Sequence, residues 1–141
     1  LDGRGEARSR ILVLEHSYHG DTIGTMSVGE RGVYNAAWTP LLFDVDTIPF
    51  PGPGKAQACL DALEAACADR PAAFIVEPLI LGAGGMLVYP PAILRDMAAI
   101  CRRTQGRFRA TPASSYALAM VSHRAFLIAS LALTAVRHGH E

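Results

Sequence analysis

Two short polar stretches, each directly after an apolar run, carry the residue types that could do chemistry. Tyr18-His19-Gly20 comes just after the run at 11–15, and Glu77 follows the run at 72–76. An aromatic ring in such a place can stack on a planar cofactor, which contributes about 0.5–1.5 kcal/mol beyond burial. A carboxylate drawn toward an apolar region needs a hydrogen-bonding or charged partner. These two stretches are therefore the candidate binding residues.

Each candidate also has an ordinary structural interpretation. Tyr18 and His19 could simply pack in a loop, and Glu77 could cap a helix or form a loop salt bridge. Lys55, the only lysine, lies in a proline-glycine turn that lacks the spacing and the hydroxyl of a phosphate loop. On their types and spacing alone, the functional and structural interpretations of Tyr18 and Glu77 both stay open.

Apolar runs and helix-forming stretches alternate along the chain and would position these residues. Residues 11–15 and 72–77 have the length and composition of buried strands. Helices are expected over 57–69 and 92–103. This order predicts an α/β fold with a mostly parallel sheet and flanking helices, in which ligands bind beyond the carboxyl ends of the strands.

Turn-forming residues predict the connections between these elements. Asp21 is placed to N-cap the short segment that follows it. Four prolines and several turn residues make 29–54 loop-like, and Gly82–Gly85 form a glycine loop after the second strand. Pro91 suits the first turn of the helix at 92–103.

Composition is that of a globular protein. Half of the 141 residues are hydrophobic, and basic and acidic residues balance at 13 each, which gives no electrostatic footprint for nucleic acid. Cys59, Cys67 and Cys101 lack Cys-x-x-Cys spacing, so we expect reduced, buried thiols in a cytoplasmic protein and no metal site. The first ten residues contain neither a secretory signal nor a methionine, so Leu1 is not expected to be the true start.

The composition changes after Gly106. Glu141 is the only acidic residue beyond that point, against twelve before it. The strand expected after the helix at 92–103 is replaced by a polar, proline-containing stretch. We therefore divide the chain into a partial domain, 1–106, and a divergent tail, 107–141, whose composition is that of a shifted reading frame in GC-rich DNA.

The tail contains one apolar stretch that approaches the length of a membrane span, residues 116–136. His123 and Arg124 stand in its middle, and an arginine near a helix centre costs about 2.5–3.5 kcal/mol on insertion scales. A buried helix or an artefactual tail is therefore favoured, and no membrane partner is predicted.

The motifs together resemble those of the class III pyridoxal-phosphate-dependent aminotransferases. The matching residues run from Glu15 to Gly24, from Phe74 to Pro78 and from Gly82 to Met86. Tyr-His-Gly-Asp-Thr combined with Gly-Ala-Gly-Gly-Met is most similar to the family members of biotin biosynthesis. The resemblance covers about residues 8–105 and implies an incomplete part of the large domain of fold type I.

The resemblance implies roles at individual positions. Tyr18 would lie over the ring of pyridoxal phosphate and border the substrate, and His19 and Gly20 would shape its turn. Glu77 would lie near the group that holds the pyridine nitrogen. Relatives that act on ornithine or aminobutyrate carry a second glutamate in the glycine loop, where this chain has Ala83-Gly84. That difference favours the biotin branch.

The implied reaction moves an amino group from S-adenosylmethionine to the keto acceptor 8-amino-7-oxononanoate, in a homodimer with sites at its interface. The cofactor acts as electron sink and is held by a lysine as a Schiff base. Lys55 does not resemble the family's lysine context, and Arg107–Ala110 stand where a strand should end in Asp-Glu. The chain alone is therefore expected to be inactive and to hold no catalytic residue. The alternatives are a non-catalytic α/β scaffold or binding domain, and a membrane-tethered domain.

Overall fold

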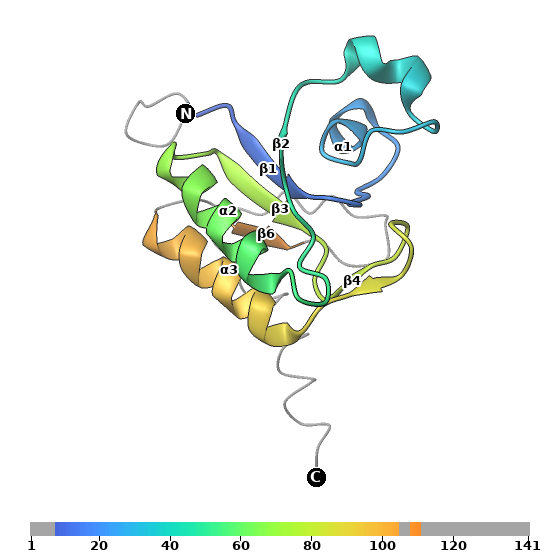
Figure 1. Ribbon diagram of the computed structural model, residues 1–141. Helices are drawn as coiled ribbons and strands as arrows, with labels where there is room; N and C mark the ends of the chain where they lie inside the picture. The colour runs from blue at the N-terminus through green and yellow to red at the C-terminus, as the bar shows by residue number, and fades with distance from the viewer. Residues whose placement is uncertain (1–7, 105–107, 111–141) are drawn as a thin grey trace.

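The chain folds around a four-stranded parallel sheet. The computed structural model describes residues 8–104 and 108–110. Strands β1 (Ile11–Leu14), β2 (Asp46–Ile48), β3 (Ala73–Val76) and β6 (Phe108–Ala110) stand in the order β2-β1-β3-β6, and every neighbouring pair is parallel (Figure 1). The predicted α/β fold with a parallel sheet is confirmed, as are the strands expected at 11–15 and 72–77.

Two helices cover one face of this sheet. Helices α2 (Ala56–Ala68) and α3 (Pro91–Arg103) lie side by side, with Pro91 in the first turn of α3 as expected (Figure 1). Alternate residues of β1 and β3 point toward them, so that Leu12, Leu14, Phe74 and Val76 join the core. All three cysteines are free and buried in or between these helices. Burial raises the pKa of the Cys59 thiol to about 11, which keeps it protonated and inert.

The segment predicted as loop, 29–54, contains two elements. A 3-10 helix, η1, spans Ala36–Leu41, and β2 forms an outer strand of the sheet, with Thr47 opposite Val13 of β1. The prediction missed β2 because three residues give no readable period, and their pairing is dictated by β1, which is distant in sequence. In Figure 1, η1 and the short helix α1 (Ile23–Ser27) lie apart from α2 and α3.

The glycine loop closes a small hairpin. Strands β4 (Ile80–Leu81) and β5 (Leu87–Val88) pair antiparallel on either side of it. Gly85 has φ +106° and Met86 has φ +58°, so the turn uses left-handed backbone that glycine adopts at low cost. This second sheet was not predicted.

A strand does follow α3, contrary to the expectation of a polar stretch in its place. Strand β6 pairs with β3, with Phe108 opposite Phe74 and Ala110 opposite Val76. Parallel pairing uses backbone N–H and C=O groups, so the three residues Phe108–Ala110 can supply it without a longer apolar run. The boundary at 106 and the character of the tail remain predictions.

The expected cap of the short helix α1 was wrong. The N-cap of α1 is Thr22, not Asp21: the Thr22 and Thr25 side chains each bond the other's backbone N–H in a capping box. Within the described part of the chain, no helix is both long and apolar enough to cross a membrane. The apolar stretch at 116–136 lies outside the described residues.

Candidate functional site

The carboxyl ends of β1 and β3 lie side by side at the switch point of the sheet, where the chain connections run in opposite directions. From β1 the chain passes to β2 on one side, and from β3 it passes to β6 on the other. The two chain connections that leave β1 and β3 therefore diverge, and open parallel sheets bind their ligands beyond the strand ends at such a point. Tyr18-His19-Gly20 lies in the first loop and Glu77 begins the second, so the topology gathers the predicted site residues at this switch point.

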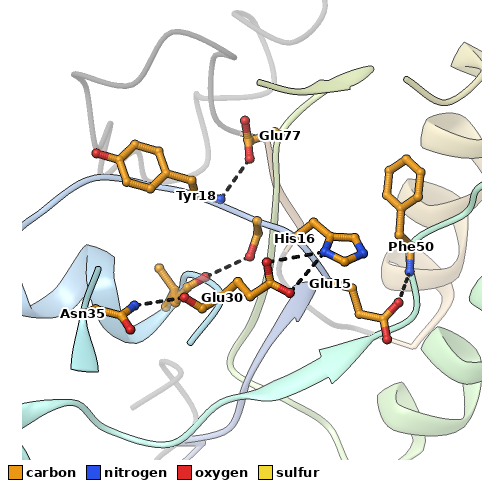
Figure 2. A network of polar contacts seen from close by, with 9 residues as sticks. Glu15, His16, Tyr18, Glu30, Asn35, Phe50 and Glu77 are labelled. Atoms are coloured by element: carbon orange, nitrogen blue, oxygen red, sulfur yellow. Dashed lines mark hydrogen bonds and ion pairs between the residues drawn. The ribbon is translucent and has the colours of Figure 1, made fainter. Parts of the chain in front are cut away.

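Glu77 is the buried charge of the site, with a relative exposure of 3%. One carboxylate oxygen, Oε1, accepts a hydrogen bond from the backbone N–H of Tyr18 at 3.0 Å, and Oε2 accepts one from Gly82 N at 3.2 Å. Figure 2 shows the first of these bonds reaching across from the Glu77 side chain to the β1 loop. These partners are loop amides, so the alternatives of an N-cap or a loop salt bridge do not describe its role.

Opposing effects set the charge of Glu77. Burial raises the pKa of its carboxyl, and the hydrogen bonds from the Tyr18 and Gly82 amides act against that rise. A third contact fixes its backbone, because the buried hydroxyl of Tyr89 donates to the Glu77 carbonyl oxygen at 2.6 Å. Burial also raises the pKa of Tyr89 far above its usual range, so this hydroxyl remains a donor.

Tyr18 presents its ring away from the sheet. The side chain is half-buried, and its hydroxyl donates to Asp21 Oδ2 at 2.8 Å. In Figure 2 the ring extends to the opposite side from His16 and Phe50. Asp21, expected as a helix cap, therefore orients the Tyr18 ring instead.

His19 and Gly20 shape the turn. His19 is buried, and burial lowers the pKa of its imidazole to about 4, so it is neutral at ordinary pH. Gly20 has φ +122°, a conformation that side-chain-bearing residues rarely adopt, and a Cβ there would lie 3.2 Å from Thr25 Oγ1. The backbone path therefore favours glycine at position 20, whatever the loop binds.

The structure adds a pair that no spacing in the sequence indicated. His16 Nδ1 lies 3.1 Å from Glu30 Oε1, and Glu30 N donates to Ser17 O at 2.8 Å (Figure 2). Both side chains of the pair are largely exposed, at 44% and 52%, so its contribution to stability is small. It ties the segment before α1 to the segment after it.

The glycine loop packs directly on the end of β1. A Cβ at Gly84 would overlap the His16 carbonyl oxygen, so only glycine fits there. His16 and Leu79 both have left-handed backbone, with φ +64° and +69°. Non-glycine residues held this way cost free energy and cluster at functional sites. Their presence in both loops supports a site at this edge.

Comparison with known proteins gives the same assignment from an independent direction. Residues 2–108 match the family Aminotransferase class-III. An adenosylmethionine-8-amino-7-oxononanoate aminotransferase of Synechococcus elongatus is 44% identical over 103 residues, which are 67% of this chain and 24% of the relative. An ornithine aminotransferase of Bacillus cereus is 32% identical over 96 residues, 68% of this chain and 22% of its own length. The chain spans about a quarter of the length of these relatives.

Solved structures agree in fold. An adenosylmethionine-8-amino-7-oxononanoate aminotransferase from Methanocaldococcus jannaschii superposes with a TM-score of 0.66 at 29% identity, covering 76% of this chain and 25% of that one. An amine transaminase from an uncultivated Pseudomonas species, in its PLP-bound internal aldimine form, gives a TM-score of 0.65 at 30% identity, covering 73% and 26%.

Proposed function

Because the chain belongs to the class III aminotransferases, we propose that it supplies one wall of the pyridoxal-phosphate site of a biotin-pathway transaminase. In this proposal Tyr18 lies over the cofactor ring and borders the substrate, and His19, Gly20 and Glu77 hold the loops that place it. The observation that carries it is the 3.0 Å hydrogen bond from Tyr18 N to the buried Glu77 carboxylate at the switch point of the sheet.

The described residues fit part of such a site. Tyr18 offers a flat, half-buried ring, and its turn is fixed by Gly20 and by the Tyr18–Asp21 hydrogen bond. Glu77 holds the two loops, because its Oε1 accepts the Tyr18 amide and its Oε2 accepts the Gly82 amide. The chain offers no lysine in the family's context for the Schiff base. Its only lysine, Lys55, is the N-cap residue of α2 and lies in a turn, where its backbone N–H donates to Gly52 O at 2.9 Å.

Each residue then has a limited task. Pyridoxal phosphate, when bound, supplies an electron sink for the carbon that carries the amino group. Tyr18 covers that region, excludes water from one side and contributes about 0.5–1.5 kcal/mol through ring contact. His19 is neutral, so it adds no positive charge beside the cofactor. None of these residues transfers a proton in this account.

We further propose S-adenosylmethionine as amino donor and 8-amino-7-oxononanoate as keto acceptor. The support is that several of the most similar relatives carry that activity in their names, at 33–44% identity. The glycine loop adds a second reason, because it has Ala83-Gly84 in the region where ornithine-type relatives carry a second glutamate. We propose a cytoplasmic location on the same grounds.

The proposal includes a homodimer. Three large apolar side chains carry this proposal by their exposure, Ile23 at 40%, Trp38 at 49% and Leu41 at 61%. Tyrosine and tryptophan are enriched where protein surfaces bind one another. Size-exclusion chromatography with light scattering tests this state: a monomer at micromolar concentration would contradict it.

The test of function is a segment chimera, in which residues 2–108 of this chain replace the matching quarter of the Synechococcus relative. We expect the chimera to bind pyridoxal phosphate and to transaminate 8-amino-7-oxononanoate with S-adenosylmethionine. The full 141-residue chain alone is expected to do neither. A folded chimera that retains no cofactor would contradict the proposal and favour the non-catalytic scaffold. Activity with ornithine in place of S-adenosylmethionine would overturn the substrate assignment alone.

A further inference from the structure

The Glu77 carboxylate is the only described side chain whose two oxygens receive hydrogen bonds from both loops of the switch point. Tyr18 N bonds Oε1 and Gly82 N bonds Oε2. Tyr18 carries the aromatic ring of the proposed site, and Gly82 opens the glycine loop. Glu77 therefore connects the loop that carries Tyr18 to the glycine loop.

Both loops need an external restraint. His16 and Leu79 are held at positive φ, and the glycine loop presses on the His16 carbonyl at a place where only Gly84 fits. Left-handed non-glycine backbone persists only where surrounding contacts enforce it. The Glu77 carboxylate supplies one contact at Tyr18, just after His16 in the first loop, and one at Gly82, just after Leu79 in the second.

The two hydrogen bonds that Glu77 accepts from Tyr18 N and Gly82 N, here called the clamp, require a carboxylate. Both partners are N–H donors, so both side-chain oxygens must accept. A glutamine of the same shape has a single acceptor oxygen, and its NH₂ group would face the other N–H. An apolar residue of similar size would leave two buried donors unpaired, which is costly.

We propose that Glu77 is a positioning residue. It fixes the orientation of the Tyr18 ring and the position of the glycine loop at the same time, and it does not touch cofactor or substrate. This rests on the proposed function for the identity of the ligand, but the two hydrogen bonds do not. The expectation that Glu77 lies near the group that holds the pyridine nitrogen stays a prediction beside it.

Amide hydrogen exchange in the chimera tests the clamp without any cofactor. In Glu77→Leu the Tyr18 and Gly82 amides should each exchange at least tenfold faster, and in Glu77→Gln at least one of them should. Glu64→Gln is the matched control, because Glu64 Oε1 accepts an exposed bond from Arg103 at 2.7 Å, and neither amide should change. Unchanged exchange at both amides in Glu77→Leu would overturn the clamp.

A second readout separates positioning from bulk stability. In the chimera loaded with pyridoxal phosphate, Glu77→Gln should shift the absorption band of the bound cofactor in the same direction as Tyr18→Ala, and kcat should fall about tenfold. If exchange rises but band and kcat match the parent, Glu77 is structural only and the positioning role is wrong. If the parent chimera itself binds no cofactor, the proposed function fails while the exchange result still decides the clamp.

Discussion

The two sides of the sheet's structure differ in what they bury. On the helix side, α2 and α3 pack on the sheet. This side buries apolar side chains, including Leu63, Phe74 and Met97, and three free thiols. The site edge is formed by the loops after β1 and β3 together with α1. It holds all the buried polar or charged residues of the described chain, which are Ser17, His19, Thr25, Ser27 and Glu77.

This difference separates stability from function. The helix side gains free energy from removing apolar surface from water, at roughly 25 cal/mol per Å². The site edge spends part of that gain on a buried carboxylate, a neutral histidine and left-handed backbone at His16 and Leu79. Changes on the helix side should therefore alter stability alone, and changes at the site edge should alter ligand-related properties as well.

The largest expected effect is on the helix side. Phe74→Ala, at a β3 position with 1% exposure, should lower the free energy of unfolding of the chimera by about 3–5 kcal/mol. Denaturant titration measures it, and kcat/KM per folded molecule should stay near the parent value. Phe43→Ala, at 45% exposure, is the control and should cost far less. A loss of kcat/KM with unchanged stability would break the comparison.

The second effect belongs to the buried histidine. Burial lowers the pKa of His19 from 6.5 to about 4, so between these values the unfolded chain binds the proton and the folded chain does not. Stability should therefore fall as the pH is lowered from above 6.5 to about 4, by on the order of 3 kcal/mol.

His19→Gln removes that titration. The difference in unfolding free energy between the parent chimera and His19→Gln should change across this pH window and level off above it. Denaturant titrations at about pH 4.5 and 5.5, inside the window, and at about pH 7.5, above it, would measure this difference. A difference that is constant with pH would mean that the pKa of His19 is the same in the folded and the unfolded chain.

A smaller effect separates two tyrosines. Tyr18→Ala in the chimera should reduce kcat/KM and weaken cofactor retention. The loss of interaction free energy should be about 1–3 kcal/mol, the sum of a ring contact and a hydrogen bond. Tyr34→Ala is the control, because Tyr34 is 97% exposed and carries no hydrogen bond to the site loops. Steady-state kinetics and cofactor release by dialysis measure both. Equal losses at the two positions would count against the role of Tyr18.

Local pattern was sufficient for elements whose structure is decided within the element. The apolar runs predicted β1 and β3, and the helix at 92–103 was predicted from composition and Pro91. Strands β2 and β6 were missed because three residues carry no period, and their pairing comes from β1 and β3. The hairpin of β4 and β5 is shorter still.

The residues of the proposed site could be named from the sequence, but their contacts could not. Tyr18 and Glu77 stood out because polar residues followed apolar runs. Their hydrogen bond depends on the register that sets Ile11 opposite Ala73, which no local pattern encodes. The His16–Glu30 pair depends on the path of the chain through α1, and it left no signal in the sequence.

The tail after Gly106 is the part of the prediction that stays untested. Translating the coding DNA in the other two frames downstream of the Gly106 codon should give an apolar strand ending in Asp-Glu and a later lysine in a strand-turn context. If neither frame contains them, the shifted frame is wrong, and a divergent, non-catalytic protein is favoured.

The central claim is that this chain provides the aromatic wall of a pyridoxal-phosphate site and not its lysine. Borohydride reduction of the cofactor-loaded chimera, followed by peptide mapping, tests it most directly. We expect one reduced adduct per subunit on a lysine contributed by the Synechococcus relative, and none on Lys55, the only lysine of this chain. Stoichiometric, specific labelling of Lys55 would contradict the account.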